Sequence, residues 1–254
     1  MAAATSYVLG YWKIRGLGAV ARMQLSMAGA SWANEYQLIT YDDAGAPLAS
    51  TWDTREGELM KEHPYVNLPF LKVTQGATTF TIVQSNAINR FLAATFGFVP
   101  KTPLDAALAD EVLEHLVEMK AELSYLAYEA KEASIPKDKA DFCEKSVPYY
   151  LGKLETRLKH RSDGTNAAGA AADPSAFLSG GEAPCWQDLY VFEVCDVANV
   201  CTEGAALKAA PTVAALCARV RAYPGLTAYF ASEDATLPMN TPGYASFATG
   251  PSTA

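Results

Sequence analysis

The pattern of hydrophobic and polar residues changes character near residue 98. Before that point, short β-prone runs alternate with stretches in which apolar residues recur at helical spacing. The predicted strands are Ser6–Trp12, Glu35–Tyr41, Phe70–Thr74 and Thr79–Val83, and the predicted helices are Ala19–Ala28, Trp52–His63 and one that begins at Ser85. This order is typical of a small sheet with helices covering its faces. We therefore predict an α/β domain over residues 1–97.

The last part of this domain carries the most local information. Gln75-Gly76-Ala77 separates the final two strands and predicts a hairpin, and Pro69 stands directly before them, where a strand tolerates proline. Ser85 is predicted as the N-cap of the next helix. A helix start offers backbone N–H groups to a carboxylate, so this stretch can hold the acidic end of an extended peptide. A plain hairpin followed by a capped helix explains the same local pattern.

Strand patterns end before the linker at residues 98–103, and residues 104–254 predict an all-helical domain. The predicted helices are Leu104–Ala133, Asp138–His160, Trp186–Asn199, Pro211–Ala222 and Leu226–Ser232. Pro148 is expected to kink or split the second of these helices. Residues 162–184 are rich in Gly, Ala, Ser and Asp and predict a surface insertion loop. In the C-terminal tail, Tyr244 and Phe247 are candidate anchors.

Composition narrows the classes of protein that fit. The 254 residues carry a net charge of −8 and no basic cluster, so nucleic acid and anionic membranes are poor partners. No apolar stretch is long enough to span a bilayer, and a signal peptide is not expected. The five cysteines form no Cys-x-x-Cys pair, which indicates buried thiols in a reducing compartment, the cytoplasm. The three histidines are far apart, so no metal site is expected.

Three motifs, taken in order, carry a resemblance to a known family. They are Gly10-Tyr11-Trp12-Lys13-Ile14-Arg15-Gly16, Asn67-Leu68-Pro69-Phe70-Leu71 and Gln84-Ser85-Asn86-Ala87-Ile88. Each motif is weak alone, but together, at these separations, they resemble a cytosolic glutathione transferase. The form of the first motif is closest to the mu class. The resemblance covers nearly the whole chain and implies a thioredoxin-like first domain, an all-α second domain and a homodimer.

The resemblance implies that Tyr11, at the end of the first strand, is the catalytic residue. A free thiol has a pKa of about 8.5, so only a few per cent is thiolate, the nucleophilic form, at neutral pH. A phenolic O–H can stabilise a thiolate by donating a hydrogen bond without itself ionising. The alternative is a tyrosine that only packs at a strand edge. Tyr7 lies on the same strand but does not match the catalytic position.

The resemblance also assigns different residues to the three parts of the tripeptide glutathione. By the resemblance, Leu68 makes main-chain contacts with the cysteinyl unit, next to Pro69 in the cis form. Gln84 and Ser85 are expected to hold the γ-glutamyl end. The residues expected on the glycyl side are Trp12, Trp52 and Asn67.

The glycyl side departs from the family pattern. The segment between Trp52 and Asn67 is longer than in typical mu relatives, and Glu56 stands near the place of an expected basic residue. Lys61 is the remaining candidate, and an arginine expected shortly before Trp52 is missing. The residues that hold the glycyl carboxylate are therefore not identified. Trp52 has an alternative role as a partly buried aromatic on a helix surface.

In the second domain the resemblance points to three positions on the first long helix. Glu118 matches an acidic residue that reaches into the glutathione site of the neighbouring subunit. Tyr128 matches a tyrosine of the electrophile site, and Tyr125 lies one turn away. A tyrosine there can donate a hydrogen bond to a developing oxyanion. A solvated helix face for Glu118 and ordinary packing for the tyrosines remain open alternatives.

Four further positions bear on assembly and folding. By the resemblance, Tyr65 matches an aromatic that plugs into the partner subunit, and Arg90 matches an arginine near the dimer axis. Asp188 matches a buried aspartate that caps the central helix of the second domain, so it is expected to serve folding. Cys185 replaces the usual Ser or Thr at that N-cap and is expected to be a weaker cap.

The function implied by the resemblance is detoxification by a glutathione S-transferase, which conjugates the glutathione thiolate to small apolar electrophiles. Glutathione is then a co-substrate, and no cofactor is expected. Two alternatives stay open: a non-catalytic member of the fold that binds glutathione or hydrophobic ligands, and a glutathione-dependent isomerase. The altered glycyl side favours the first alternative, whereas Tyr11 and the Gln84-Ser85 pair favour the transferase.

Overall fold

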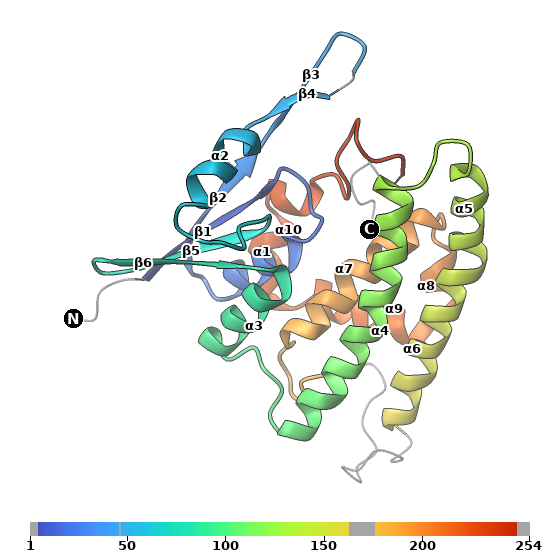
Figure 1. Ribbon diagram of the computed structural model, residues 1–254. Coiled ribbons are helices and arrows are strands. Elements are labelled where there is room, and N and C mark those ends of the chain that lie inside the picture. The colour runs from blue at the N-terminus through green and yellow to red at the C-terminus, as the bar shows by residue number, and fades with distance from the viewer. Residues whose placement is uncertain (1–4, 46, 163–175, 248–254) are drawn as a thin grey trace. The chain divides into compact units, whose positions relative to one another are not determined.

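The computed structural model describes residues 5–45, 47–162 and 176–247. It divides into two compact units (Figure 1): residues up to Gly97 together with Ala228–Ala245, and Phe98–Thr227 together with Ser246 and Phe247. The sequence placed all of 104–254 in the second domain, whereas residues 228–245 pack with the first unit. Most of the predicted insertion loop, residues 163–175, lies outside the described residues.

The first unit is built on a four-stranded sheet in the order β2-β1-β5-β6. β1 pairs in parallel with β2, and the pairings β1–β5 and β5–β6 are antiparallel. The strands are β1 (Thr5–Trp12), β2 (Ser31–Gln37), β5 (Phe70–Gln75) and β6 (Thr78–Val83). Gly76, with φ of +61°, permits the tight β5–β6 connection that the sequence predicted.

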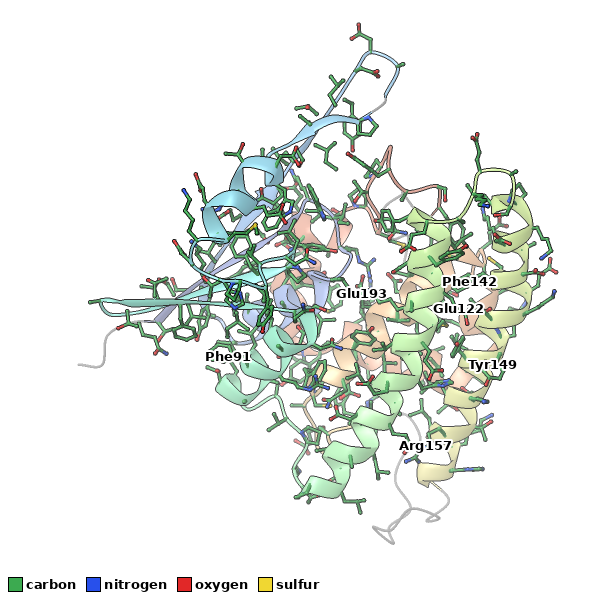
Figure 2. All side chains as sticks on the ribbon, in the orientation of Figure 1. Phe91, Glu122, Phe142, Tyr149, Arg157 and Glu193 are labelled. Carbon is green, nitrogen blue, oxygen red and sulfur yellow. The ribbon has the colours of Figure 1, made fainter. Side chains whose placement is uncertain are left out.

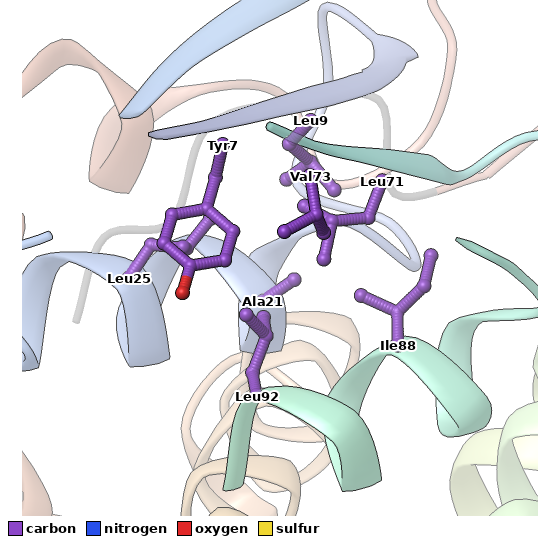
Figure 3. Close-up of a cluster of buried hydrophobic side chains, with 8 residues drawn as sticks. All are labelled: Tyr7, Leu9, Ala21, Leu25, Leu71, Val73, Ile88 and Leu92. Atoms are coloured by element: carbon purple, nitrogen blue, oxygen red, sulfur yellow. The ribbon is translucent and has the colours of Figure 1, made fainter. Parts of the chain in front are cut away.

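Helices cover both faces of this sheet. On one face α1 (Ala19–Met27) and α3 (Ser85–Phe96) enclose a buried apolar cluster (Figure 3). Its members are Tyr7, Leu9, Ala21, Leu25, Leu71, Val73, Ile88 and Leu92. Because strand side chains alternate between faces, Phe70 lies in a second cluster with Trp52 and Leu59 of α2 (Trp52–Leu59). A Cβ at Gly10 would lie 2.1 Å from the Phe70 ring, so that ring requires glycine at position 10.

A second, two-stranded sheet was not predicted. β3 (Ile39–Tyr41) pairs with β4 (Pro47–Ser50), whereas the sequence predicted one strand over Glu35–Tyr41 and a loop after it. The strand breaks at Leu38, whose N–H donates to Thr51 Oγ1 at 2.9 Å instead of to a neighbouring strand. The two parts therefore pair with different partners.

The second unit is all-helical, as predicted. Its helices are α4 (Pro103–Tyr128), α5 (Ile135–Asp141), α6 (Val147–Ser162), α7 (Trp186–Cys201), α8 (Ala205–Ala209) and α9 (Pro211–Arg221). The short α8 was not predicted. α7 is the central helix of the unit, because all its residues from Trp186 to Ala198 are buried. Tyr150 of α6 donates to Glu122 at 2.8 Å, on the side of α4 that faces α6 (Figure 2).

The predicted interruption at Pro148 takes a specific form. A π-helical turn, η1 (Phe142–Ser146), separates α5 from α6 just before the proline. Pro148 has no N–H to donate, and its ring displaces the carbonyl of Glu144, four residues earlier. The wider π turn accommodates the proline, so that α5, η1 and α6 follow one another without a break.

After α9 the chain forms three short helical segments, which are the 3₁₀ turn η2 (Pro224–Leu226), the helix α10 (Thr227–Phe230) and the 3₁₀ turn η3 (Glu233–Thr236). Phe247 is buried and its ring lies edge-on to Phe142 at 6.4 Å, so it is an anchor as predicted. The prediction for Tyr244 was wrong, because that side chain is 53% exposed. None of the described helices is both long and apolar enough to cross a membrane.

Candidate functional site

The Tyr11 side chain lies at the end of β1 inside the turn that follows it. The residue is 6% exposed, and its hydroxyl oxygen accepts a hydrogen bond from the Leu17 N–H at 3.0 Å. A Cβ at Gly16 would lie 2.6 Å from this hydroxyl, and one at Gly18 would lie 2.8 Å from the ring. The two glycines are therefore required for the turn to wrap closely around the phenol.

This environment favours hydrogen-bond donation by Tyr11. A hydroxyl that accepts a hydrogen bond becomes a better donor, because the two bonds polarise each other. The Arg22 guanidinium carbon lies 6.0 Å from the Tyr11 ring centroid, which places a positive charge beside the phenol. Tyr7 differs: it belongs to the sheet core, its ring contacts Phe96 edge-on at 5.7 Å, and burial raises its pKa.

The Leu68–Pro69 peptide bond is cis, as the resemblance implied. Pro69 is buried directly before β5, and Leu68 is half-buried. The Leu68 N–H, which was expected to contact a ligand, donates to Asn67 Oδ1 at 2.7 Å. A ligand that takes up this N–H must therefore displace the Asn67 side chain, which is exposed and can rotate away.

The start of α3 differs from the sequence prediction. The N-cap is Gln84, with φ of +71°, and Ser85 is the first helical residue, so the prediction of Ser85 as N-cap was wrong. The turn out of β6 is made by the unusual Gln84 backbone, whose carbonyl accepts from the Ile88 N–H at 3.0 Å. The Gln84 side chain makes no capping hydrogen bond to this helix. Its first N–H groups thus have no partner within the helix and present the positive end of the dipole.

The aromatic residues expected on the glycyl side belong to the second apolar cluster. Trp52 is 9% exposed, and its ring stacks on Phe70 with the centroids 6.3 Å apart. Trp12 is partly buried and packs against the same cluster. Trp52 is therefore a core residue.

Sequence reasoning overlooked a cation in this region. Arg55 follows Trp52 by one helical turn, whereas the cation predicted to follow Trp52 was expected near Glu56 or at Lys61. Its guanidinium donates to Glu35 at 2.7 and 3.2 Å and to Glu58 at 2.8 Å, and the bond to Glu35 is the main cause of its raised pKa. Arg55 is thus paired with two carboxylates. Lys61 is exposed just after α2.

The three candidate residues of the second unit lie on α4 and are all exposed. Tyr125 is 55% exposed and Tyr128 is 45% exposed, so neither is a packing residue of the helix core. The negative charge of Glu118 adds to the burial and the Glu122 bond that together raise the pKa of Tyr150 to about 12. Glu118 is thus exposed on α4, and its charge acts on Tyr150 of α6.

The two residues expected at a subunit interface are also exposed. Tyr65 is 73% exposed, in the loop before Asn67. The Tyr65 ring lies edge-on to the His63 ring, with the centroids 5.9 Å apart. The Tyr65 backbone N–H donates to His63 Nδ1 at 3.2 Å, which fixes the imidazole against which the tyrosine packs. Arg90 lies on the exposed side of α3. Among the described residues, no group of three or more His, Cys, Asp or Glu could hold a metal ion.

Known proteins match this chain in sequence. Residues 117–233 match the family model of the glutathione S-transferase C-terminal domain. Glutathione S-transferase P of Homo sapiens is 30% identical over 238 residues, which is 93% of this chain and 98% of that protein. Glutathione S-transferase Mu 2 of Macaca fascicularis is 33% identical over 151 residues, 59% of this chain and 61% of that protein.

Solved structures match it in fold. The Pi-class glutathione S-transferase of Onchocerca volvulus covers 94% of this chain and 99% of its own, with a TM-score of 0.70 and 23% identity. Glutathione S-transferase Blo t 8 covers 95% and 99%, with a TM-score of 0.73 and 19% identity. These structures confirm the predicted fold, a thioredoxin-like domain followed by a helical domain. Together with the relatives at 30% identity over nearly their full length, they establish that the chain belongs to the glutathione S-transferase family.

Proposed function

We propose that this chain is an enzyme that conjugates the glutathione thiolate to small apolar electrophiles. The observation that carries the proposal is the position of the Tyr11 hydroxyl, which is buried in the turn after β1 and accepts from the Leu17 N–H. A phenol held at this position can stabilise a sulfur anion by donating a hydrogen bond to it. No metal or organic cofactor enters this chemistry; glutathione itself is the co-substrate.

The reaction needs a thiolate at neutral pH. Donation from Tyr11 favours the ionised sulfur over the thiol and lowers the pKa of the bound thiol, whose proton passes to water. With a chloro-dinitrobenzene as electrophile, a sulfur electron pair forms the new S–C bond. Chloride leaves with the electron pair of the broken C–Cl bond. The phenol remains protonated throughout and can serve the next cycle.

The peptide is proposed to lie along the edge of the first unit. The Leu68 backbone pairs with the cysteinyl unit beside Pro69, and the γ-glutamyl carboxylate binds at the uncapped start of α3, at Gln84 and Ser85. The first turn of α3 is partly exposed and receives no capping hydrogen bond from the Gln84 side chain, which supports this placement. The same interpretation puts the glycyl end near Trp12, Trp52 and Asn67.

The glycyl carboxylate still needs a cation. Arg55 is paired with Glu35 and Glu58, so Lys61, which is exposed at the end of α2, is the proposed partner. Glu118 of the neighbouring subunit is proposed to complete the glutathione site. Tyr128, with Tyr125 beside it, is proposed to donate to the electrophile, and the exposure of both hydroxyl-bearing rings supports this role.

A homodimer is proposed, with Tyr65 inserted into the partner subunit and Arg90 near the twofold axis. A tyrosine that is 73% exposed and held by His63 fits such a role, because a rigid aromatic anchor loses little entropy on docking. Sedimentation of Tyr65→Ala checks this: a shift toward monomer is expected, and an unchanged profile would contradict the plug.

The transferase class and the cellular location are each proposed from a single feature of the chain. The form of the Gly10–Gly16 motif supports placement with the mu class, whereas the Glutathione S-transferase P relatives align over more of the chain. The five cysteines are thiols, which supports residence in the reducing cytoplasm and a detoxifying role there.

The deciding experiment compares Tyr11→Phe with wild type in a chloro-dinitrobenzene conjugation assay. We expect kcat to fall on the order of 10²-fold, the usual effect of removing one donor to a developing anion, with KM for glutathione little changed. Tyr7→Phe is the matched control, since it removes a phenol oxygen from the core side of the same strand and should leave the rate unchanged. Equal rates for wild type and Tyr11→Phe would exclude Tyr11 from catalysis. A wild type that binds glutathione without conjugating it would favour the non-catalytic alternative.

A further inference from the structure

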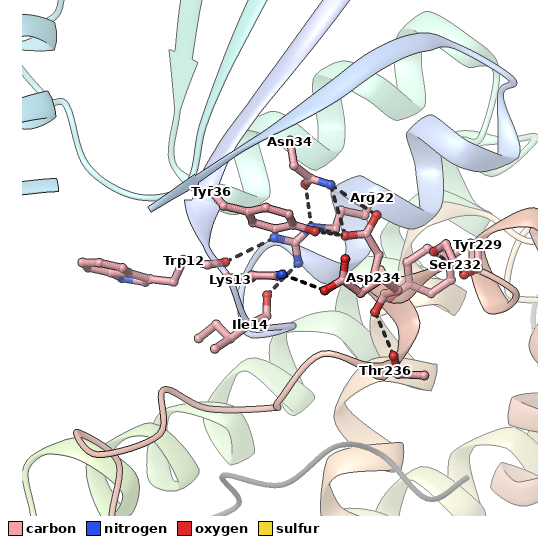
Figure 4. A network of polar contacts seen from close by, with 11 residues as sticks. Trp12, Lys13, Ile14, Arg22, Asn34, Tyr36, Tyr229, Ser232, Asp234 and Thr236 are labelled. Atoms are coloured by element: carbon pink, nitrogen blue, oxygen red, sulfur yellow. Dashed lines mark hydrogen bonds and ion pairs between the residues drawn. The ribbon is translucent and has the colours of Figure 1, made fainter. Parts of the chain in front are cut away.

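A buried arginine holds the start of the turn that surrounds Tyr11. Arg22 lies on α1 and is 0% exposed. One terminal nitrogen, Nη1, donates to the Ile14 carbonyl at 2.7 Å. The other, Nη2, donates to the Trp12 carbonyl at 3.3 Å (Figure 4). These two carbonyls stand on either side of Lys13. A single rigid guanidinium thus fixes the chain directly after Tyr11.

The remaining edge of the guanidinium is held by groups from β2 and from the C-terminal segment. Arg22 Nε donates to Asn34 Oδ1 at 2.9 Å and lies 3.6 Å from Asp234 Oδ1. Asn34 Nδ2 donates to both oxygens of Asp234, at 3.1 and 3.2 Å, and the Tyr36 hydroxyl donates to Oδ1 as well. Because a buried cation is stable only when it is paired and fully hydrogen-bonded, Asp234 is needed to keep Arg22 in this position.

The C-terminal segment also holds the turn through its main chain. The Arg15 N–H donates to the Pro238 carbonyl at 2.8 Å, and the Gly16 N–H donates to the Met239 carbonyl at 3.2 Å. The next residue, Leu17, is the one whose N–H donates to the Tyr11 hydroxyl. Pro238 and Met239 therefore hold the middle of the turn through their carbonyls, while Arg22 holds its start.

We propose that Arg22 and Asp234 are positioning residues for Tyr11, and that the C-terminal segment thereby fixes the orientation of the Tyr11 hydroxyl. Arg22 fixes the carbonyls of Trp12 and Ile14, and Asp234 fixes Arg22. The inference rests on the proposed function, since it assigns to these residues the geometry on which thiolate stabilisation by Tyr11 depends. None of the proposed glutathione contacts beyond Tyr11 and Trp12 belongs to this network, so loosening it should affect the chemistry more than the binding.

The test is Asp234→Asn, which keeps the size and the acceptor oxygen but removes the charge that holds Arg22. We expect KM for glutathione to change less than about twofold and kcat to fall about tenfold, a barrier change of about 1.4 kcal/mol. The ultraviolet absorbance of the bound thiolate, followed against pH, should show its titration about one pH unit higher, since a misaimed phenol stabilises the anion less. Asp234→Glu should recover part of both effects.

Glu233→Gln is the matched control. Glu233 neighbours Asp234, but its carboxylate forms an exposed ion pair with Lys13, at 2.7 Å, rather than a bond to Arg22, so its loss should leave kcat and the thiol titration close to wild type. If Asp234→Asn fails to fold, Tyr36→Phe replaces it, because that change removes only the hydroxyl that donates to Asp234. It should shift the titration in the same direction by a smaller amount.

Two results would overturn the inference. One is a wild-type titration of bound thiol and a wild-type kcat in Asp234→Asn or Tyr36→Phe. The other is a lowered melting temperature with an unchanged thiol titration, which would make the network merely structural. If Tyr11→Phe itself leaves kcat and the titration unchanged, then both the proposed function and the positioning role are refuted. Loss in Tyr11→Phe without loss in Asp234→Asn refutes the positioning role alone.

Discussion

Two helix starts in this molecule are built in opposite ways. The first turn of α3 follows a strained residue, Gln84, and has no side-chain cap. The first turn of α7 is closed by its own residues, with Cys185 and Asp188 forming a reciprocal capping box. Every helix start needs partners for its orphan N–H groups. At α7 the chain itself supplies these partners, whereas the start of α3 is where we propose that the γ-glutamyl carboxylate of glutathione binds.

The closure of α7 is complete. Asp188 is 0% exposed and accepts from the Leu178 N–H at 2.8 Å, the Cys185 N–H at 2.8 Å and the Cys185 thiol at 3.1 Å. Burial raises the pKa of the Cys185 thiol well above its usual range, so it remains a protonated donor. A cysteine at the N-cap was expected to be a weak cap, and here the carboxylate three residues later makes most of the hydrogen bonds.

Asp188→Ala should have the largest effect on stability. It leaves two buried N–H groups without their acceptor and should reduce the free energy of unfolding by about 3 kcal/mol, measured by urea denaturation. Asp105→Ala is the control: Asp105 sits at the same position of α4 and bonds Thr102 near the surface, so its loss should cost only about 1 kcal/mol. Equal losses for the two variants would contradict the importance of burial at α7. The KM for glutathione of folded Asp188→Ala should equal that of wild type.

A third helix start is capped from a distance. The Glu155 carboxylate of α6 accepts from the N–H groups of Thr212, at 2.9 Å, and Val213, at 3.0 Å, in the first turn of α9. Burial alone would raise its pKa, but these bonds and the one from Lys159 outweigh burial and lower it. The anion is therefore the form that the fold stabilises.

Glu155→Gln should have an intermediate effect that depends on pH. Because the folded pKa lies below the unfolded value, the stabilisation is present above the unfolded pKa, about 4.3, and is lost as pH falls through the folded pKa. At neutral pH the variant should lose about 1–2 kcal/mol. Melting temperatures of wild type and variant, compared across pH, should converge below pH of about 4. A difference that stays constant as pH falls below about 4, through the folded pKa, would show that the charge of Glu155 does not matter.

How far the sequence predicted these features depends on how local their causes are. The order of the four-stranded sheet and its helices in residues 5–97 follows from periodicity, and the β5–β6 hairpin follows from Gly76. The three motifs identified the family and with it the cis bond at Pro69. The predicted interruption near Pro148 also has a local cause, the missing N–H of proline.

The rest depends on contacts between distant residues. The break at Leu38 is stabilised by Thr51, which lies after the next hairpin, and no pattern in Glu35–Tyr41 predicts it. The C-terminal segment joins the first unit through the carbonyls of Pro238 and Met239, which carry no sequence signal. Arg55 was overlooked because a cation was expected at a fixed offset from Trp52, and its pairing with Glu35 bridges two elements.

Substituting Gln84, whose backbone is unusual, should change stability least. It also compares the starts of α3 and α7 most directly. A non-glycine residue with φ of +71° is strained by about 1–3 kcal/mol, and strain of this kind is common at ligand sites. Gln84→Gly relieves the strain but gives the unfolded chain more freedom, worth about 0.5–1 kcal/mol. We therefore expect the free energy of unfolding to stay the same or to rise by about 1 kcal/mol.

The glutathione affinity should respond differently, because Gln84→Gly removes the side chain proposed to hold the γ-glutamyl end. The Kd for glutathione, measured by calorimetry, should rise about tenfold, the loss of roughly 1.4 kcal/mol of binding. Glu203→Gly is the matched control, since Glu203 also has a positive φ, +53°, but lies in the turn after α7. It should show a similar change in stability with no change in Kd. If both variants bind glutathione like wild type, the strained start of α3 is a feature of folding, like the start of α7, and not of ligand binding.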